Sequence, residues 1–119
     1  MRTVTESIPG LLIARPEGRI YFGNAANVGA KLMTLIGASH PQVVLLDCSA
    51  IPGFEYTALK MLIESEERLR HEGIDVWLAA LNPEAWELVQ RTPLAERLGR
   101  ERMYITVERA VDAYLARKR

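Results

Sequence analysis

Apolar and polar residues alternate along the chain in blocks, and the blocks predict short β-strands separated by longer α-helices. Five short apolar runs are typical of strands. Two of them, Gln42–Cys48 and Asp75–Leu81, contain no regular polar alternation, which indicates strands covered on both faces. The five predicted strands are Gly10–Arg15, Arg19–Gly23, Gln42–Cys48, Asp75–Leu81 and Met103–Thr106.

Between these runs, apolar residues recur at helical spacing. Asn24 and Asn82 are predicted N-cap residues, the second followed by a proline at the first helical position. Glycines 37, 73 and 99 are placed to end helices. The predicted helices follow Asn24, span about Thr57–Glu72, run from Pro83 through Val89, cover Leu94–Leu98, and begin again near Val107.

The predicted element order is therefore ββαβαβαβα, and it defines an α/β fold. Strands that alternate with helices pair in parallel through right-handed crossovers. The first two strands are close enough to form a hairpin around the turn "PEGR", which would add an antiparallel edge. We predict one domain with a mixed sheet of four to five strands and four to five helices.

Composition narrows the class of protein. The 119 residues suit a single domain, and 15 basic residues balance 15 acidic ones, so we expect no nucleic-acid binding. The single cysteine excludes an internal disulfide and, with no signal peptide, favours a reducing compartment. The apolar runs are far shorter than the roughly 20 residues that cross a bilayer, so we expect no membrane insertion by this segment.

The stretch "LLDCSAIPGFEYTALKML" carries the most chemical information. Asp47 ends a buried strand, and Thr57 lies at or next to the N-terminus of the next helix. There, unpaired N–H groups and the helix dipole favour an anion, so Thr57 is a candidate phosphoacceptor. The alternative is that Thr57 serves only as an N-cap. Glu55 opposes phosphorylation, because it would place a carboxylate beside the phosphate.

The same stretch resembles the signature of STAS domains. Asp47 matches the aspartate at the strand end, Glu55 stands at the loop aspartate, and Tyr56 stands at the first hydroxyl position. Thr57 stands at the phosphoacceptor position and Ala58 at the small residue that follows. Glu55 and Tyr56 depart from the usual Asp and Ser.

Three further segments, "IPGLLIARPEGRIYFGNA", "LNPEAWELVQRTPLAERLG" and "YITVERAVDAYL", are similar to STAS domains at the C-terminus of SulP-type (sulfate permease family) anion transporters. The resemblance covers about residues 8–115. It implies a STAS-like (SpoIIAA-like) fold over residues 1–119, as one domain excised from a longer membrane transporter. It also implies a cytoplasmic, non-enzymatic regulatory module at an inner (plasma) membrane.

Two functions from this family remain open, a transporter module and a free-standing anti-sigma factor antagonist switched by phosphorylation at Thr57. We also propose that Phe54, Glu55, Tyr56 and Lys60 form a contact surface for the transporter's membrane domain or a cytosolic protein. A small α/β enzyme is disfavoured, since no nucleophile, base and orienting group stand out.

No metal site or cofactor is expected, because His40 and His71 lack partners at ligand spacing. No phosphate-binding loop supports nucleotide binding, although some STAS domains are thought to bind nucleotides. Glu64, Glu66 and Glu67 are expected on the exposed face of their helix. Small and aromatic side chains are expected to fill the core, namely Cys48, Trp77 and Trp86.

Overall fold

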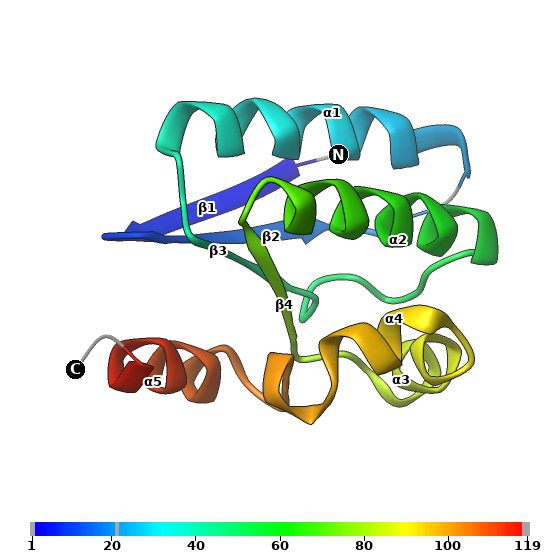
Figure 1. The fold of residues 1–119 in the computed structure, drawn as a ribbon. Helices are drawn as coiled ribbons and strands as arrows, with labels where there is room; N and C mark the ends of the chain where they lie inside the picture. Colours follow the sequence, from blue (N-terminus) through cyan, green and yellow to red (C-terminus); the bar gives the residue numbers. More distant parts are fainter. Residues whose placement is uncertain (1, 21, 118–119) are drawn as a thin grey trace.

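A five-stranded sheet with helices on both faces forms the domain (Figure 1), as a computed structural model that describes residues 2–20 and 22–117 shows. The strands are β1 (Arg2–Ile8), β2 (Leu11–Glu17), β3 (Val43–Asp47), β4 (Asp75–Ala79) and β5 (Met103–Tyr104). The α-helices are α1 (Phe22–Ser39), α2 (Tyr56–His71), α3 (Pro83–Gln90), α4 (Pro93–Leu98) and α5 (Val107–Arg117). A short 3₁₀ turn, η1 (Arg100–Arg102), precedes β5.

The strands lie in the order β1-β2-β3-β4-β5. β1 and β2 are antiparallel, and the three other neighbouring pairs are parallel. The prediction of a mixed α/β sheet with an antiparallel edge is confirmed. None of the helices in the described part of the chain is both long and apolar enough to span a membrane.

The antiparallel edge uses other residues than those predicted. β1 pairs with β2 from Ile8 opposite Leu11 to Arg2 opposite Glu17, around a turn at Gly10, whose φ is +82°. The prediction of Arg19–Gly23 as the second strand is wrong. β1 was missed because its sequence, RTVTESI, is that of an exposed edge strand with little apolar content.

The segment after β2 turns toward the β3–α2 loop instead of folding back as a strand. The Gly18 N–H donates to the Ala50 carbonyl over 2.9 Å, and Ile20 forms a single bridge with Phe54. Tyr21, which the prediction placed in the strand, lies outside the described residues. The "PEGR" turn therefore leads the chain past the loop that carries the candidate site.

The first helix is longer than its sequence signals indicate. α1 begins at Phe22, so Asn24 is not its N-cap, and the Asn24 side-chain amide donates to the Arg19 carbonyl over 3.0 Å. Gly37 lies inside the helix, which continues to Ser39. The left-handed residue that follows the helix is His40, with φ of +47°. A glycine predicts a helix end only where the backbone needs a positive φ.

The other helix boundaries agree with the predictions to within about two residues. Gly73 follows α2 with φ of +81°, and Gly99 follows α4 with φ of +61°. Asn82 is the N-cap of α3, and its side-chain oxygen accepts from the Ala85 N–H over 2.8 Å. β5 ends at Tyr104 and does not reach Thr106.

Successive side chains along each strand point to opposite faces of the sheet. One face, with Val44, Leu46 and Leu78, lies under α1 and α2, which run side by side over it (Figure 1). The other face, with Leu45 and Trp77, packs against Tyr114 and the rest of the apolar side of α5. All five residues of β3 are buried. The prediction that the central strands are covered on both faces is confirmed.

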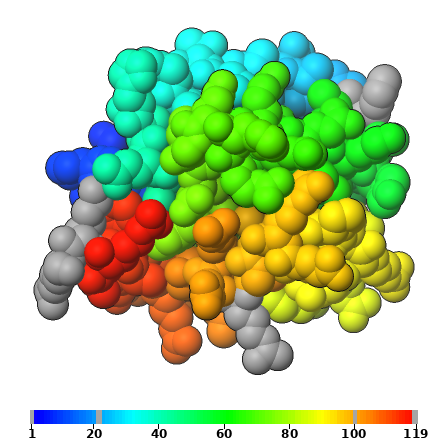
Figure 2. Space-filling model, in the orientation of Figure 1, coloured from blue at the N-terminus to red at the C-terminus, as the bar shows by residue number. Residues whose placement is uncertain are grey.

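Two side chains lie where the sequence did not place them. Glu66 is 1% exposed, and its carboxylate lies 3.5 Å from Arg70 and 3.6 Å from Arg97. It is buried because α4 lies against α2, as Figure 2 shows with the green and yellow-orange segments in contact. Trp86 is 41% exposed, so its predicted core position is wrong, whereas Trp77 is buried as predicted.

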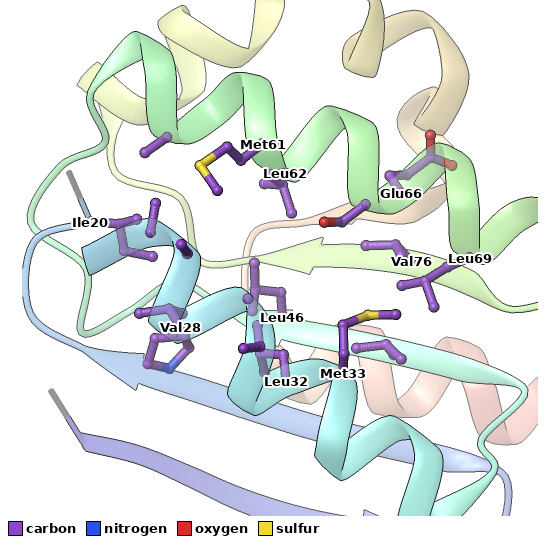
Figure 3. A pocket seen from close by; sticks show the side chains of 18 of the residues that line it. Ile20, Val28, Leu32, Met33, Leu46, Met61, Leu62, Glu66, Leu69 and Val76 are labelled. Carbon is purple, nitrogen blue, oxygen red and sulfur yellow. The ribbon is translucent and has the colours of Figure 1, made fainter. Parts of the chain in front are cut away.

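A cavity of about 270 Å³ lies between α1, α2 and the sheet, and we call it the α1–α2 cavity (Figure 3). Its walls are mainly aliphatic and include Val28, Leu32, Met33, Leu46, Met61 and Leu62. The cavity is not sealed, because it is partly open to solvent.

Candidate functional site

The candidate site is the loop between β3 and α2 together with the first turn of α2. β3 ends at Asp47, as predicted, and the Asp47 carboxylate accepts a hydrogen bond from the Ser49 N–H over 2.9 Å. The Cys48 N–H donates to the Ala79 carbonyl of β4 over 2.9 Å. The loop therefore starts at the carboxyl edge of the parallel strands, where α/β proteins commonly place functional groups.

Two other segments hold the far end of this loop. The Ile20 N–H donates to the Gly53 carbonyl over 3.2 Å, and the Glu55 N–H donates to the Ile20 carbonyl over 3.1 Å. From the opposite side, the Asn82 amide donates to the Pro52 carbonyl over 2.9 Å. These bonds fix the direction in which the chain enters α2. The contact made by Asn82 could not be predicted from the sequence, which indicates only that residue's role as an N-cap.

Thr57 is the second residue of α2, and its side chain is exposed. Glu55, two positions earlier, is the N-cap, so the alternative in which Thr57 caps the helix is wrong. The first turn of α2 carries no acidic side chain. Because Thr57 lies in this first turn, an anion on its oxygen would be at the positive end of the helix dipole.

The side chains of the predicted contact surface divide into two groups. Glu55, Tyr56 and Lys60 are exposed, with Tyr56 at 64%. Phe54 is only 9% exposed and packs into the core beneath them. Tyrosine is among the residues enriched at protein–protein interfaces.

A shallow groove runs from Tyr56 to the neighbouring helix α3. It is lined by Phe54, Tyr56 and Leu88, and charged side chains border it at Glu84, Glu87 and Arg91. Sequence reasoning missed the α3 side of this groove. The signal available was the charged face of α3, which does not show on its own that it faces the α2 N-terminus.

Cys48 lies just behind the site and is buried. Burial, with a smaller contribution from the neighbouring Asp47 carboxylate, raises the pKa of the Cys48 thiol well above its ordinary value of 9.0. The thiol is therefore protonated at neutral pH, which fits its predicted role as a small core residue. Among the described residues, no three His, Cys, Asp or Glu side chains are grouped so that they could hold a metal ion.

The fold and this surface define a small α/β domain with an exposed loop and helix terminus at the carboxyl edge of its sheet. The STAS domain family matches residues 2–110, so the chain belongs to the STAS domain family. This confirms the family resemblance seen in the sequence.

The curated relatives include sulfate transporters. Sulfate transporter 3.1 of Arabidopsis thaliana is 26% identical over 120 residues, which cover 92% of this chain and 18% of the transporter. A probable sulfate transporter of Mycobacterium tuberculosis is 24% identical over 112 residues, covering 92% of this chain and 20% of the transporter. The chain thus spans about one-fifth of the length of these relatives.

Solved structures share the fold. A sulfate transporter family protein from Wolinella succinogenes gives a TM-score of 0.79 at 23% identity, covering 96% of this chain and 93% of that one. The unphosphorylated anti-sigma factor antagonist SpoIIAA gives 0.77 at 14% identity, covering 97% of each chain. The murine solute carrier 26 family member A9 anion transporter gives 0.80 at 18% identity, covering 92% of this chain and 18% of the transporter. These likenesses confirm the STAS-like (SpoIIAA-like) fold.

Proposed function

We propose that this chain is the regulatory and interaction domain of a SulP-type sulfate (anion) transporter. The observation that carries the proposal is its similarity to sulfate transporters over 92% of its own length but only 18% of theirs. In this proposal residues 1–119 form one STAS domain that follows the membrane helices and lies in the cytoplasm at the inner (plasma) membrane. The same open reading frame should then encode ten or more hydrophobic spans upstream, and their absence would remove the proposal.

The proposed domain acts by binding and not by catalysis. Its buried thiol is held protonated, and the site exposes a tyrosine, a lysine and a threonine at one helix terminus. These groups suit recognition of a protein surface, since an exposed aromatic supplies contact area and a lysine supplies complementary charge. The proposed partner is the membrane domain of the parent transporter or a cytosolic protein.

The contact surface in this proposal consists of Glu55, Tyr56 and Lys60, supported from below by Phe54. The three exposed side chains project from consecutive turns at one end of α2. The groove toward α3 continues this surface and adds Leu88 and Arg91. Its mixture of apolar and charged groups fits a regulated contact of moderate affinity better than a permanent one.

A free-standing anti-sigma factor antagonist switched at Thr57 is the alternative. It is favoured by the exposure of Thr57 at the second position of α2 and opposed by Glu55, whose carboxylate would repel a phosphate. Incubation with a cognate anti-sigma kinase, followed by mass spectrometry, tests it. The alternative predicts one phosphate, lost in Thr57→Ala and retained in Thr34→Ala, which removes another exposed hydroxyl. An unmodified wild-type chain counts against it.

A further inference from the structure

We propose that the α1–α2 cavity is a binding site for a single-chain anionic amphiphile, whose aliphatic chain of about ten carbons fills the cavity and whose head group lies at Ser65 and Arg68. This site shares Phe54 with the β3–α2 loop, but the proposal does not depend on the proposed function.

The size of the cavity sets the size of the ligand. A dry apolar cavity of about 150 Å³ accepts a six-carbon ring. On the same scale, the 270 Å³ of the α1–α2 cavity has room for roughly ten carbon atoms. Water in this cavity finds few hydrogen-bond partners, because the walls are mainly aliphatic.

The shape of the cavity favours one extended chain. It follows α2 from Phe54 and Ala58 at one end to Leu69 at the other. Figure 3 shows Met61 and Leu62 of α2 and Leu46 of β3 directed into the space between the two helices. A single linear chain fits such a slot beneath two neighbouring helices, whereas a lipid with two long chains exceeds its volume.

The charges at the rim select the head group. Among the described lining residues, Arg68 is the only cation and Glu66 the only anion. Glu66 is engaged by Arg70 and Arg97, and its carboxylate points away from the cavity in Figure 3. Ser65 lies three positions before Arg68 on the same helix face. The rim therefore offers a hydroxyl and a guanidinium, which together suit a carboxylate or a similar anion.

The walls can adapt to a chain. Met33 from α1 and Met61 from α2 both line the cavity, and methionine fills irregular apolar gaps through its three rotatable bonds. The α1 wall is thinned by Gly29, where an added Cβ would meet no atom within 4 Å. A residue with a larger side chain at position 29 would occupy part of the space that the ligand needs.

Titration of the purified chain with decanoate tests the proposal, by calorimetry and by thermal unfolding. We expect saturable binding of one decanoate per chain and a rise in Tm of about 10 °C at a free concentration about 100 times the Kd. Butanoate, which keeps the head group but shortens the chain, should bind at least tenfold more weakly. Decyltrimethylammonium, which keeps the chain but reverses the charge, should also bind at least tenfold more weakly.

Two glycines on the same helix provide a matched pair of variants. Gly29→Leu should weaken decanoate binding at least tenfold, because the new side chain fills the cavity. Gly37→Leu, at an exposed site that does not line the cavity and where an added Cβ is equally unhindered, should leave the Kd unchanged. Gly29→Ala is the milder second variant if Gly29→Leu fails to unfold cooperatively. Arg68→Gln should weaken decanoate binding while leaving the affinity for decanol within twofold.

Three results would overturn the proposal: no saturable binding of decanoate, binding that Gly29→Leu does not weaken, or equal affinity for decanoate and decyltrimethylammonium. Vesicles of dioleoyl phosphatidylglycerol distinguish a free amphiphile from a membrane lipid. Co-sedimentation with these vesicles in the absence of decanoate binding would contradict the assignment, because it would place the recognised anion on a membrane surface. Binding of decanoate with no co-sedimentation supports it.

Discussion

At the scale of single residues, the Cys48 thiol links the stability of the domain to pH. Burial raises its pKa in the folded state, so the folded chain keeps this proton at a pH where the unfolded chain releases it. The stabilisation is fully present below the unfolded pKa of about 9 and declines as the pH rises above it. Tyr104, whose pKa is also raised, mainly by burial and then by Glu101, adds to this decline above about pH 10.

We therefore expect the free energy of unfolding to fall by up to about 1.4 kcal/mol per pH unit through the Cys48 thiol between pH 9 and 10. In the Cys48→Ala variant the free energy of unfolding should fall less steeply with pH, because the thiol no longer contributes. This expectation holds whatever the effect of the substitution on stability at neutral pH. Urea unfolding at closely spaced pH values measures both slopes. Equal slopes for the two chains would show that the thiol does not titrate differently in the folded and unfolded states.

Exposure was predictable for some residues of the site and not for others. The exposed hydroxyl of Thr57 follows from its place at a helix terminus. Glu66 was misplaced because its neighbours Glu64 and Glu67 are exposed. A signal was nevertheless present, since Leu59, Leu62, Glu66 and Leu69 lie on one helical stripe. A carboxylate on such a stripe needs a buried partner, and Arg97 comes from a helix that the pattern of α2 alone does not reveal.

At the scale of elements, an ion pair between Glu66 and Arg97 joins α2 to α4. The Glu66 side chain is 1% exposed, and it pairs with Arg97, which is 26% exposed. Arg97 also lies 3.6 Å from Glu67, which is 50% exposed. The two glutamates thus share a cationic partner but differ in burial.

Glu66→Gln should destabilise the domain by about 1–3 kcal/mol, because it leaves the partly buried Arg97 without its inner counter-charge. Glu67→Gln, the control with the same partner, should change stability by less than about 0.5 kcal/mol. Chemical denaturation of both variants measures the difference. Similar losses for the two would mean that burial of Glu66 does not strengthen its contribution.

The N-terminal part of α2 is the element that the proposed function places against a partner. Tyr56→Ala and Lys60→Glu should each reduce recovery of the transporter's membrane domain in cross-linking experiments. For Tyr56→Ala the recovery should fall about tenfold or more. Leu115→Ala and Glu108→Lys make matching changes on α5, across the sheet, and should leave recovery unchanged. Unchanged recovery for both α2 variants would argue against the proposed surface.

The sequence determined some elements much better than others. β3, β4 and α2 were located because their apolar runs and helical spacing are strong and their ends carry glycine or asparagine. β1 was missed because an edge strand needs few apolar residues, and its pairing depends on a turn at Gly10. The hydrogen bonds from Ile20 and Asn82 to the β3–α2 loop could not be predicted either, because they join segments far apart in the sequence.

At the scale of the whole molecule, two neighbouring surfaces of α2 have separate proposed roles. The N-terminal end carries the contact surface, and the face toward α1 forms the α1–α2 cavity. Ala58 lines the cavity one residue after Thr57. The two sites therefore share a helix, so a ligand that changes the position of α2 would also move the contact surface.

The central claim is that this domain belongs to a transporter that is about five times as long, as the relatives' coverage indicates. Immunoblotting of fractionated cells of the source organism, with an antibody raised against residues 2–117, tests it directly. We predict one polypeptide about five times the length of this chain, found with the membranes and released only by detergent. A 13.4 kDa polypeptide that stays in the supernatant after membranes are sedimented would contradict the claim and favour the free-standing alternative.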